Sequence, residues 1–183
     1  MIKAHLTIDA KGLSCPMPIV KTKQAMNDLA EGEVMEVQAT DAGSTADIEA
    51  WAESAGHQYI GTLEKDGVLF HYLRKGERDQ KIDQTFVQVI SNEEILKRDG
   101  CILDVREAAE YAFGHIEGAK SIPLGELKDR LDELDPNEAI YVICRTGNRS
   151  DLAARILTEH GFKHVYNVLP GMTKWNGKLV KEI

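Results

Sequence analysis

The sequence predicts an α/β protein with two domains. The first is expected to be a βαβαββ two-layer sandwich, and the second an α/β/α domain with a mostly parallel sheet. A polar stretch over residues 76–85 separates two segments that are richer in apolar residues. In each segment, short runs with the period of a strand alternate with runs of helical period. Residues 139–143 are almost continuously apolar, which is typical of a central strand covered on both faces.

These observations place the domains at residues 1–75 and 86–183, with a polar linker over residues 76–85. The chain has 183 residues, 43% of them hydrophobic, and a net charge of −8. Its apolar runs are shorter than the roughly 20 residues that a membrane helix needs, and polar residues interrupt the N-terminus before a signal-peptide core could form. We therefore expect a cytoplasmic protein with no membrane partner. The negative charge also argues against direct binding to nucleic acid.

The elements of the first segment follow from its periodicity and its turn residues. Residues 44–47 read Ser-Thr-Ala-Asp, a capping signature that predicts the start of a helix, and Gly56 predicts its end. The dipeptide Asp66-Gly67 is typical of a tight hairpin turn. The expected order is a strand around residues 6–8, a helix over 16–30, a strand over 33–39, a helix from residue 44 to 55, and strands near 58–63 and 68–73.

The second segment has the same alternation. Four leucines recur at helical spacing over residues 124–134. A second helical pattern, formed by Leu152, Ala153, Ile156 and Leu157, ends before Gly161. The expected strands are residues 86–90, 101–105, 120–122, 140–143 and 164–168. Strands that alternate with helices predict a parallel sheet.

Cys144 gives the strongest chemical signal, because it opens a stretch, residues 144–150, that directly follows the central strand and directly precedes an amphipathic helix. Ligands of open α/β sheets bind at the carboxyl ends of the strands. Gly147 permits the positive φ that a tight loop needs. The helix N-terminus, Arg145 and Arg149 add positive charge, which favours an anion on or near the sulfur. The alternative is a buried cysteine with a purely structural role.

The second segment also contains a series of ordered motifs. They are residues 102–107 (Ile-Leu-Asp-Val-Arg-Glu), 110–111 (Glu-Tyr), 114–119 (Gly-His-Ile-Glu-Gly-Ala), 122–124 (Ile-Pro-Leu), 144–150 (Cys-Arg-Thr-Gly-Asn-Arg-Ser) and 169–172 (Leu-Pro-Gly-Met), together with Trp175. In these motifs the segment resembles the rhodanese domain family. The resemblance implies a catalytic Cys144 that becomes a persulfide, and Asp104 and Arg106 are expected to support the loop. The backbone amides that would hold the outer sulfur belong to Arg145, Thr146, Gly147, Asn148 and Arg149.

The length of this loop separates two chemistries. Four residues lie between Cys144 and Arg149, whereas related phosphatases have five and a loop wide enough for phosphate. The shorter loop resembles that of sulfurtransferases, which house a single sulfur. An arsenate reductase or phosphatase that uses the same Cys-Arg loop is the alternative enzyme class.

Cys15 is the second chemical signal, in the stretch Gly-Leu-Ser-Cys-Pro-Met-Pro over residues 12–18. Proline is favoured at the first turn of a helix, so Cys15 is expected at a helix N-terminus, where the dipole favours a thiolate. Lys21 and Lys23 would add to this effect. Pro18 stands where a Cys-x-x-Cys pair would need a second cysteine, so a local redox disulfide is excluded. The alternative is that Cys15 merely starts the helix.

The surrounding residues of the first segment resemble the TusA/SirA sulfur-carrier family. The resemblance rests on residues 6–9, 12–13, 15–20, 44–48 and 74–76, with Asp41, Trp51, Gly56 and His57. It implies a βαβαββ fold and a Cys15 that carries sulfane sulfur between proteins. The third cysteine, Cys101, is interpreted as a core residue. Three cysteines are a poor disulfide framework, and they and the histidines lack the spacing of a zinc site, so no metal is expected.

Together these features suggest a sulfurtransferase fused to a sulfur carrier. Sulfane sulfur would pass from a small donor, thiosulfate or a persulfide, to Cys144 and on to an acceptor thiol, with Cys15 as the candidate. No cofactor is expected beyond the covalent cysteine persulfides. The expected partners are the donor, acceptor thiol proteins and, where Cys15 cannot reach Cys144 of its own chain, a second copy in a homodimer. A non-catalytic docking protein of sulfur trafficking is the third hypothesis.

Overall fold

The computed structural model describes residues 2–76 and 83–183. The chain divides into two compact units, Met1–Arg78 and Asp79–Glu182, and each is described by itself. Six residues of the predicted linker, 77–82, lie outside the described part of the chain.

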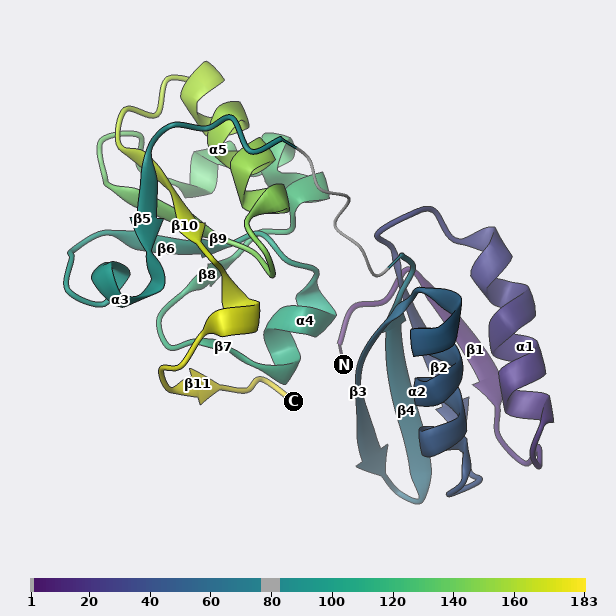
Figure 1. Cartoon of the computed structure of the whole chain (residues 1–183). Helices are drawn as coiled ribbons and strands as arrows, with labels where there is room; N and C mark the ends of the chain where they lie inside the picture. The colour runs from purple at the N-terminus through teal and green to yellow at the C-terminus, as the bar shows by residue number, and fades with distance from the viewer. Residues whose placement is uncertain (1, 77–82) are drawn as a thin grey trace. The chain divides into compact units, whose positions relative to one another are not determined.

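The first unit is built on a four-stranded sheet with the order β1-β2-β4-β3 (Figure 1). β1 and β2 are parallel, as strands joined by a crossover helix are, and β4 is antiparallel to both of its neighbours. At the hairpin, Asp66 and Gly67 have positive φ values of 53° and 74°, which confirms the predicted turn. The strands are β1 (Leu6–Ala10), β2 (Val34–Ala39), β3 (Gln58–Lys65) and β4 (Val68–Arg74).

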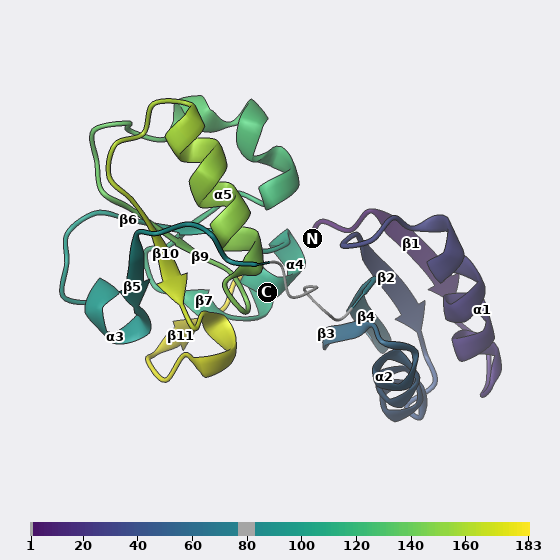
Figure 2. The same ribbon diagram turned by 45° about the horizontal axis from the view of Figure 1, so that its top comes forward.

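Both helices of this unit, α1 (Met17–Ala25) and α2 (Ser44–Ala55), cover the same face of the sheet (Figures 1 and 2). A 3-10 turn, η1 (Met26–Asp28), continues α1. On β2 the side chains of Met35 and Val37 are fully buried in one cluster with Ile48 of α2. Burial of each such side chain contributes about 1.5–3 kcal/mol. The predicted βαβαββ sandwich is confirmed.

The predicted bounds of α2, residues 44–55, are confirmed, whereas the predicted side-chain cap at its start is not. Its N-cap residue is Gly43, and no side chain caps this end. The hydroxyl of Ser44 instead donates to the carbonyl oxygen of Asp41 at 2.6 Å and lies 3.1 Å from Nε2 of His71. The predicted capping role of residues 44–47 is therefore wrong. The Ser44 hydroxyl bonds Asp41 and contacts His71 instead, and the carboxylate of Asp47 accepts a hydrogen bond from Cys15.

The second unit contains a five-stranded sheet with the order β5-β10-β9-β6-β8. Each of its adjacent strand pairs is parallel. β9 lies at the centre and spans the residues that the sequence predicts, which confirms its expected place. The five strands are β5 (Val89–Ser91), β6 (Cys101–Asp104), β8 (Lys120–Ser121), β9 (Ile140–Ile143) and β10 (Val165–Leu169). A separate antiparallel pair joins β7 (His115–Ile116) and β11 (Leu179–Val180).

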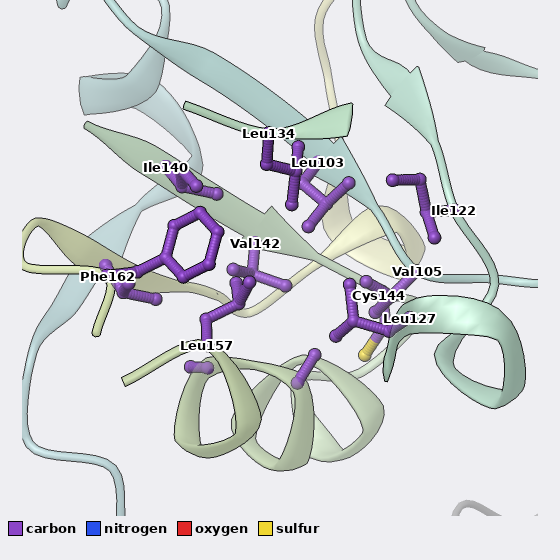
Figure 3. Packing of buried hydrophobic residues seen from close by; sticks show 13 residues of the cluster. Leu103, Val105, Ile122, Leu127, Leu134, Ile140, Val142, Cys144, Leu157 and Phe162 are labelled. Carbon is purple, nitrogen blue, oxygen red and sulfur yellow. The ribbon is translucent and has the colours of Figure 1, made fainter. Parts of the chain in front are cut away.

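Two hydrophobic clusters cover the two faces of this sheet, because alternate side chains of β9 point to opposite sides. Ile140 and Val142 lie in one cluster with α5 (Asn148–Glu159), and Cys144 belongs to this cluster (Figure 3). Tyr141 and Ile143 lie in the other, with α3 (Asn92–Ile95), α4 (Ala108–Phe113) and η4 (Met172–Lys174). The unit is therefore the α/β/α domain that the sequence predicts.

The four leucines over residues 124–134 do not form one α-helix. Three of them lie in two 3-10 helices, η2 (Leu124–Asp129) and η3 (Leu131–Glu133), and Leu134 follows the second in an extended conformation. Arg130 between them has φ −125° and ψ 19°, which is outside the helical range. The leucines still face the sheet. Their helical spacing therefore predicted their burial correctly but predicted the wrong type of helix.

No helix in the described ranges, 2–76 and 83–183, has the length and apolar character needed to cross a membrane.

Candidate functional sites

Cys144 lies at the carboxyl end of β9, and its side chain is fully buried. Gly147 ends the loop after it with φ 97° and is the N-cap residue of α5. The loop backbone is fixed from outside by η4, since the N–H of Met172 donates to the carbonyl oxygen of Cys144 at 2.9 Å and that of Thr173 to the carbonyl oxygen of Arg145 at 3.0 Å. The predicted order of a strand, a glycine loop and a helix is confirmed, although the helix begins earlier than the sequence predicts, at Asn148.

The backbone N–H of Gly147 donates to Sγ of Cys144 at 3.1 Å. This sulfur also lies near the N-terminus of α5, whose partial positive charge favours an anion. Both features stabilise negative charge at the sulfur or on an atom bound to it. Such a site fits a cysteine nucleophile.

Ser150 makes a second contact to the sulfur, and Asn167 bonds both Ser150 and the loop. Oγ of Ser150 lies 3.3 Å from Sγ of Cys144 and 2.6 Å from Oδ1 of Asn167. Nδ2 of Asn167 donates to the carbonyl oxygen of Gly147 at 3.2 Å. Ser150 and Asn167 are fully buried. The sequence reasoning assigned neither a role, although a lone polar residue in the apolar strand β10 was a usable signal.

Arg149 is paired with a carboxylate that the sequence reasoning did not connect to it. Its Nη1 and Nη2 donate to the two oxygens of Glu110 at 2.7 and 3.0 Å, and both side chains are buried. Glu110 also accepts the backbone N–H of Glu107 at 3.0 Å. The expectation that Arg149 adds a full positive charge to the loop is therefore corrected, because Glu110 neutralises it. Within residues 2–76 and 83–183, Arg145 makes no ion pair of this kind.

Asp104 and Arg106 form a second buried ion pair. Nη2 of Arg106 donates to Oδ2 of Asp104 at 2.6 Å and to the carbonyl oxygen of Gly114 at 2.8 Å. Burial lowers the pKa of Arg106, but the adjacent Asp104 outweighs it and the net pKa is raised. The pair ties the end of β6 to the turn after α4. This geometry fits the supporting role that we expected of both residues.

Gln84 also contacts the loop that follows Cys144. Its Nε2 donates to Oδ1 of Asn148 at 3.0 Å and lies 3.4 Å from the carbonyl oxygen of Thr146. Gln84 belongs to the predicted linker, whereas in the structure it contacts two residues of the predicted sulfur-binding loop. Its polar neighbours in sequence gave no signal of this contact.

Cys15 lies one residue before Pro16, the N-cap of α1, and is exposed. Because β1 and β2 are parallel, α1 and α2 both begin at the carboxyl ends of these strands. This topology brings the first turn of α2 to Cys15, whose Sγ donates to Oδ2 of Asp47 at 3.3 Å. The sequence gave no indication of this contact.

The contact reverses the expected acidity of Cys15. The hydrogen bond to Asp47 raises the pKa of the Cys15 thiol, and partial desolvation and the charges of Asp47 and Asp41 raise it further. Lys21, which we expected beside the thiol, donates to the carbonyl oxygen of Asp9 at 3.0 Å. The prediction of a thiolate stabilised at the helix N-terminus is therefore wrong for the free thiol.

Cys101 lies at the start of β6, at the opposite end of the strands from Cys144, and packs against the core. Burial and the nearby Glu138 raise the pKa of its thiol, although Lys120 lowers it. The three cysteines are free thiols. Across residues 2–76 and 83–183, no cluster of three or more His, Cys, Asp or Glu side chains could hold a metal ion.

Two family models match this chain. The model described as "Sulfurtransferase TusA" matches residues 6–75, and that described as "Rhodanese-like domain" matches residues 86–178.

Individual relatives match one or both domains. "Putative sulfur carrier protein YrkF" of Bacillus subtilis is 51% identical over 187 residues and covers 97% of this chain and 99% of its own. "Putative sulfur carrier protein YrkI" of the same organism is 45% identical and covers 41% of this chain and 100% of its own. Among solved structures, the rhodanese-like domain protein from Staphylococcus aureus is 31% identical, covers 52% of this chain and 98% of its own, and has a TM-score of 0.49.

The fold and the matches define a sulfur-transfer protein that combines a carrier domain with a rhodanese-like domain. The chain belongs to the TusA family through its first domain and to the rhodanese-like family through its second. A carrier domain of this family implies protein partners in sulfur relay.

Proposed function

We propose that the chain is a sulfurtransferase that takes sulfane sulfur from a donor such as thiosulfate onto Cys144 and passes it to the thiol of Cys15. The Cys144 thiolate attacks the outer sulfur of thiosulfate, the S–S bond of the donor breaks, and sulfite leaves with the electron pair. The thiolate of Cys15 then attacks the outer sulfur of the Cys144 persulfide and releases Cys144. Two displacements replace one direct transfer, with no net oxidation and no cofactor.

The observation that carries this proposal is the hydrogen bond of 3.1 Å from the Gly147 N–H to Sγ of Cys144. It ties the sulfur to a tight loop at the N-terminus of α5, where charge on sulfur is favoured. The backbone N–H groups of residues 145–149 are the proposed donors to the outer sulfur of the persulfide. Thiosulfate suits this end of the sheet because it is an anion.

The pairing of Arg149 favours sulfur transfer over phosphatase or arsenate reductase chemistry. An oxyanion enzyme with a Cys-Arg loop needs the guanidinium to grip the substrate oxygens in a bidentate manner. Here both terminal nitrogens of Arg149 donate to Glu110. A single sulfur atom needs no such grip, so the geometry supports the sulfurtransferase hypothesis.

Cys15 is the proposed acceptor because it is exposed and lies in the carrier domain. A short linker raises the effective concentration of one site near another, commonly to the millimolar range. Transfer within one chain and transfer between two copies in a homodimer both fit this role. Other acceptor thiol proteins then receive sulfur from Cys15.

Intact mass measured without reductant tests the proposal directly. The wild type, Cys144→Ser, Cys15→Ser and Cys101→Ser are each incubated with thiosulfate, and Cys101→Ser is the matched control. We expect a gain of one sulfur atom that reductant removes, that survives in Cys101→Ser, and that is lost in Cys144→Ser. Peptide mapping should find sulfur on Cys15 only when Cys144 is present.

Two results would contradict the proposal. A gain of sulfur in Cys144→Ser equal to that of the wild type would remove Cys144 from the reaction. Turnover of an aryl phosphate or arsenate, with no persulfide from thiosulfate or from a low-molecular-weight persulfide, would favour the alternative enzyme class.

A further inference from the structure

Asp47 is placed to respond to the chemical state of Cys15. Its Oδ2 accepts the thiol hydrogen of Cys15 at 3.3 Å. The two residues are 32 positions apart and meet because α1 and α2 begin at the same edge of the sheet. Asp47 is half-buried in the first turn of α2, whereas Cys15 is exposed. The carboxylate is thus held by the fold, and the thiol is the more accessible partner.

A carboxylate discriminates between the unloaded and the loaded carrier. The unloaded thiol has a hydrogen to donate, and a charged acceptor strengthens such a bond. A persulfide is a stronger acid than its parent thiol, so the loaded side chain is an anion at neutral pH. An anion at the same place has no hydrogen for Asp47 and meets like charge, which disfavours it.

The charges around Cys15 reinforce this difference. Asp41, in the loop before α2, acts on Cys15 in the same direction as Asp47. The N-termini of α1 and α2 oppose both carboxylates, because their dipoles favour an anion. Asp41 makes no hydrogen bond to the thiol in the described structure; its Oδ1 accepts the Gly43 N–H at 3.4 Å. Asp47 and Asp41 therefore both place negative charge near Cys15, but only Asp47 accepts a hydrogen bond from its thiol in the described structure.

We propose that Asp47 is a positioning residue that retains the unloaded thiol of Cys15 and repels the persulfide formed on it, so that the carrier turns its sulfur outward when it is loaded. This inference rests on the proposed role of Cys15 as a sulfur carrier. In addition to that role, Asp47 makes the reactivity of Cys15 depend on whether it carries sulfur. The unloaded thiol is protected from stray electrophiles, and the loaded sulfur is directed to an acceptor.

The loading step balances without any further reactant. A donor persulfide R–S–SH gives its outer sulfur to Cys15; the S–S bond of the donor breaks and a new S–S bond forms on Sγ. The donor leaves as the thiol R–SH, and the total number of hydrogens is unchanged. The Cys15 persulfide then loses its proton to water, and the hydrogen bond to Asp47 is lost with it.

Two measurements on the full-length protein test the inference, with Asp47→Asn compared to the wild type and Asp41→Asn as the charge-matched control. The first is the pH dependence of iodoacetamide alkylation of unloaded Cys15, followed by peptide mass spectrometry. We expect Asp47→Asn to alkylate several-fold faster near neutral pH, with its profile moved to lower pH. Asp41→Asn should shift less, because it loses charge without losing a hydrogen bond.

The second measurement is the fraction of Cys15 that carries sulfur at equilibrium with glutathione persulfide and glutathione. Asp47→Asn should hold several-fold more sulfur than the wild type at the same ratio, because the repulsion is removed. Asp47→Ser is a second neutral variant in case the amide disturbs the start of α2, and circular dichroism checks the fold of each variant.

The outcomes separate this inference from the proposed function. If wild-type Cys15 loads, but its alkylation profile and loaded fraction match those of both Asp47 variants, the role of Asp47 is wrong and the carrier role stands. If Cys15 takes up sulfur in none of the proteins, the carrier role fails and the inference fails with it.

Discussion

Sγ of Cys144 lies 3.3 Å from Oγ of Ser150, and Asn167 fixes the direction of the hydrogen bond between them. The carbonyl oxygen of Gly147 can only accept, so Nδ2 of Asn167 faces it and Oδ1 faces Ser150. The Ser150 hydroxyl then donates to Asn167 and accepts the thiol hydrogen of Cys144. When Cys144 is a thiolate, the hydroxyl must turn and donate to sulfur instead.

Ser150→Ala should therefore slow the loading of Cys144. The thiolate keeps the Gly147 N–H but loses its second donor. A hydrogen bond to a charged group contributes about 1.5–3 kcal/mol, and the wild type gives up the bond to Asn167 to make it. We expect loading by thiosulfate to slow about tenfold, which corresponds to about 1.4 kcal/mol. The rate is measured by quenching the reaction at a series of times, trapping the persulfide by alkylation and quantifying it by mass spectrometry.

Thr158→Ser in the same helix is the control for Ser150→Ala, since Oγ1 of Thr158 bonds the carbonyl oxygen of Ala154 and not the site. Equal loading rates in Ser150→Ala and the wild type would remove Ser150 from the mechanism.

Gly147→Ala should damage both the loop and its chemistry. At φ 97° a side chain is strained, and the added Cβ would overlap Cδ2 of Leu169 and approach Nε2 of Gln84 to 2.8 Å. We expect a loss of about 1–3 kcal/mol in the free energy of unfolding of the second domain. Loading should slow at least about tenfold, because the N–H that donates to sulfur moves. Urea unfolding and persulfide trapping give the two values.

Gly125→Ala is the matched control, because a Cβ there meets nothing within 4 Å and φ is not positive. If Gly147→Ala behaves like Gly125→Ala in both assays, the loop geometry does not control the sulfur.

The sequence predicted most of the fold, because the spacing of apolar residues within a short segment indicates both its secondary structure and its buried face. The run over residues 140–143 identified β9 to the residue, since a central parallel strand is apolar on both faces. The leucines over residues 124–134 were harder to interpret, because helical spacing also fits consecutive 3-10 turns that bury one side. Burial was predictable there, whereas the hydrogen-bonding pattern was not.

The site was predictable only where it is local in sequence. Cys144 and its loop follow from a strand, a glycine and a helix in consecutive positions. The pairing of Arg149 with Glu110 spans 39 positions, and single-sequence patterns carry no signal for it. For Asp47 a local signal existed and misled, since Ser-x-x-Asp suggests a cap while the fold turns the carboxylate to Cys15.

Glu110→Leu should destabilise the second domain strongly. Removing one partner of a buried ion pair leaves the other charge uncompensated, which costs about 3–5 kcal/mol. Arg149 would be that charge. The double variant Glu110→Leu/Arg149→Met should lose less than Glu110→Leu alone, because neither charge of this pair is left buried without its partner. Urea unfolding followed by the fluorescence of Trp175, in a Trp51→Phe background, measures both.

An exposed ion pair offers the control for the Glu110 prediction. Glu133 bonds Arg130 at the surface, so Glu133→Gln should cost less than about 1 kcal/mol. A double variant that is less stable than Glu110→Leu would show that the pair does not act as a unit.

His71 should make the stability of the first domain depend on pH. Its ring is buried in the fold, and burial lowers its pKa from 6.5 to about 4. Nε2 lies 3.1 Å from the Ser44 hydroxyl, which already donates to Asp41, so Nε2 carries the hydrogen. Nδ1 lies 3.0 and 2.9 Å from the hydroxyls of Tyr59 and Thr62, and its single lone pair accepts a hydrogen bond at this side of the ring. The neutral ring is therefore the form that the fold selects.

The sign of the effect follows from these two pKa values. Between pH 6.5 and about 4 the unfolded chain binds the proton and the folded domain does not. The stability that neutral His71 contributes is thus complete above pH 6.5 and is lost as the pH falls toward 4. The loss is on the order of 3 kcal/mol. Urea unfolding followed by Trp51 fluorescence in a Trp175→Phe background should give a shallower pH dependence in His71→Gln, whereas exposed His160→Gln should retain that of the wild type. Parallel curves for His71→Gln and the wild type would mean that His71 titrates alike in the folded and unfolded chain.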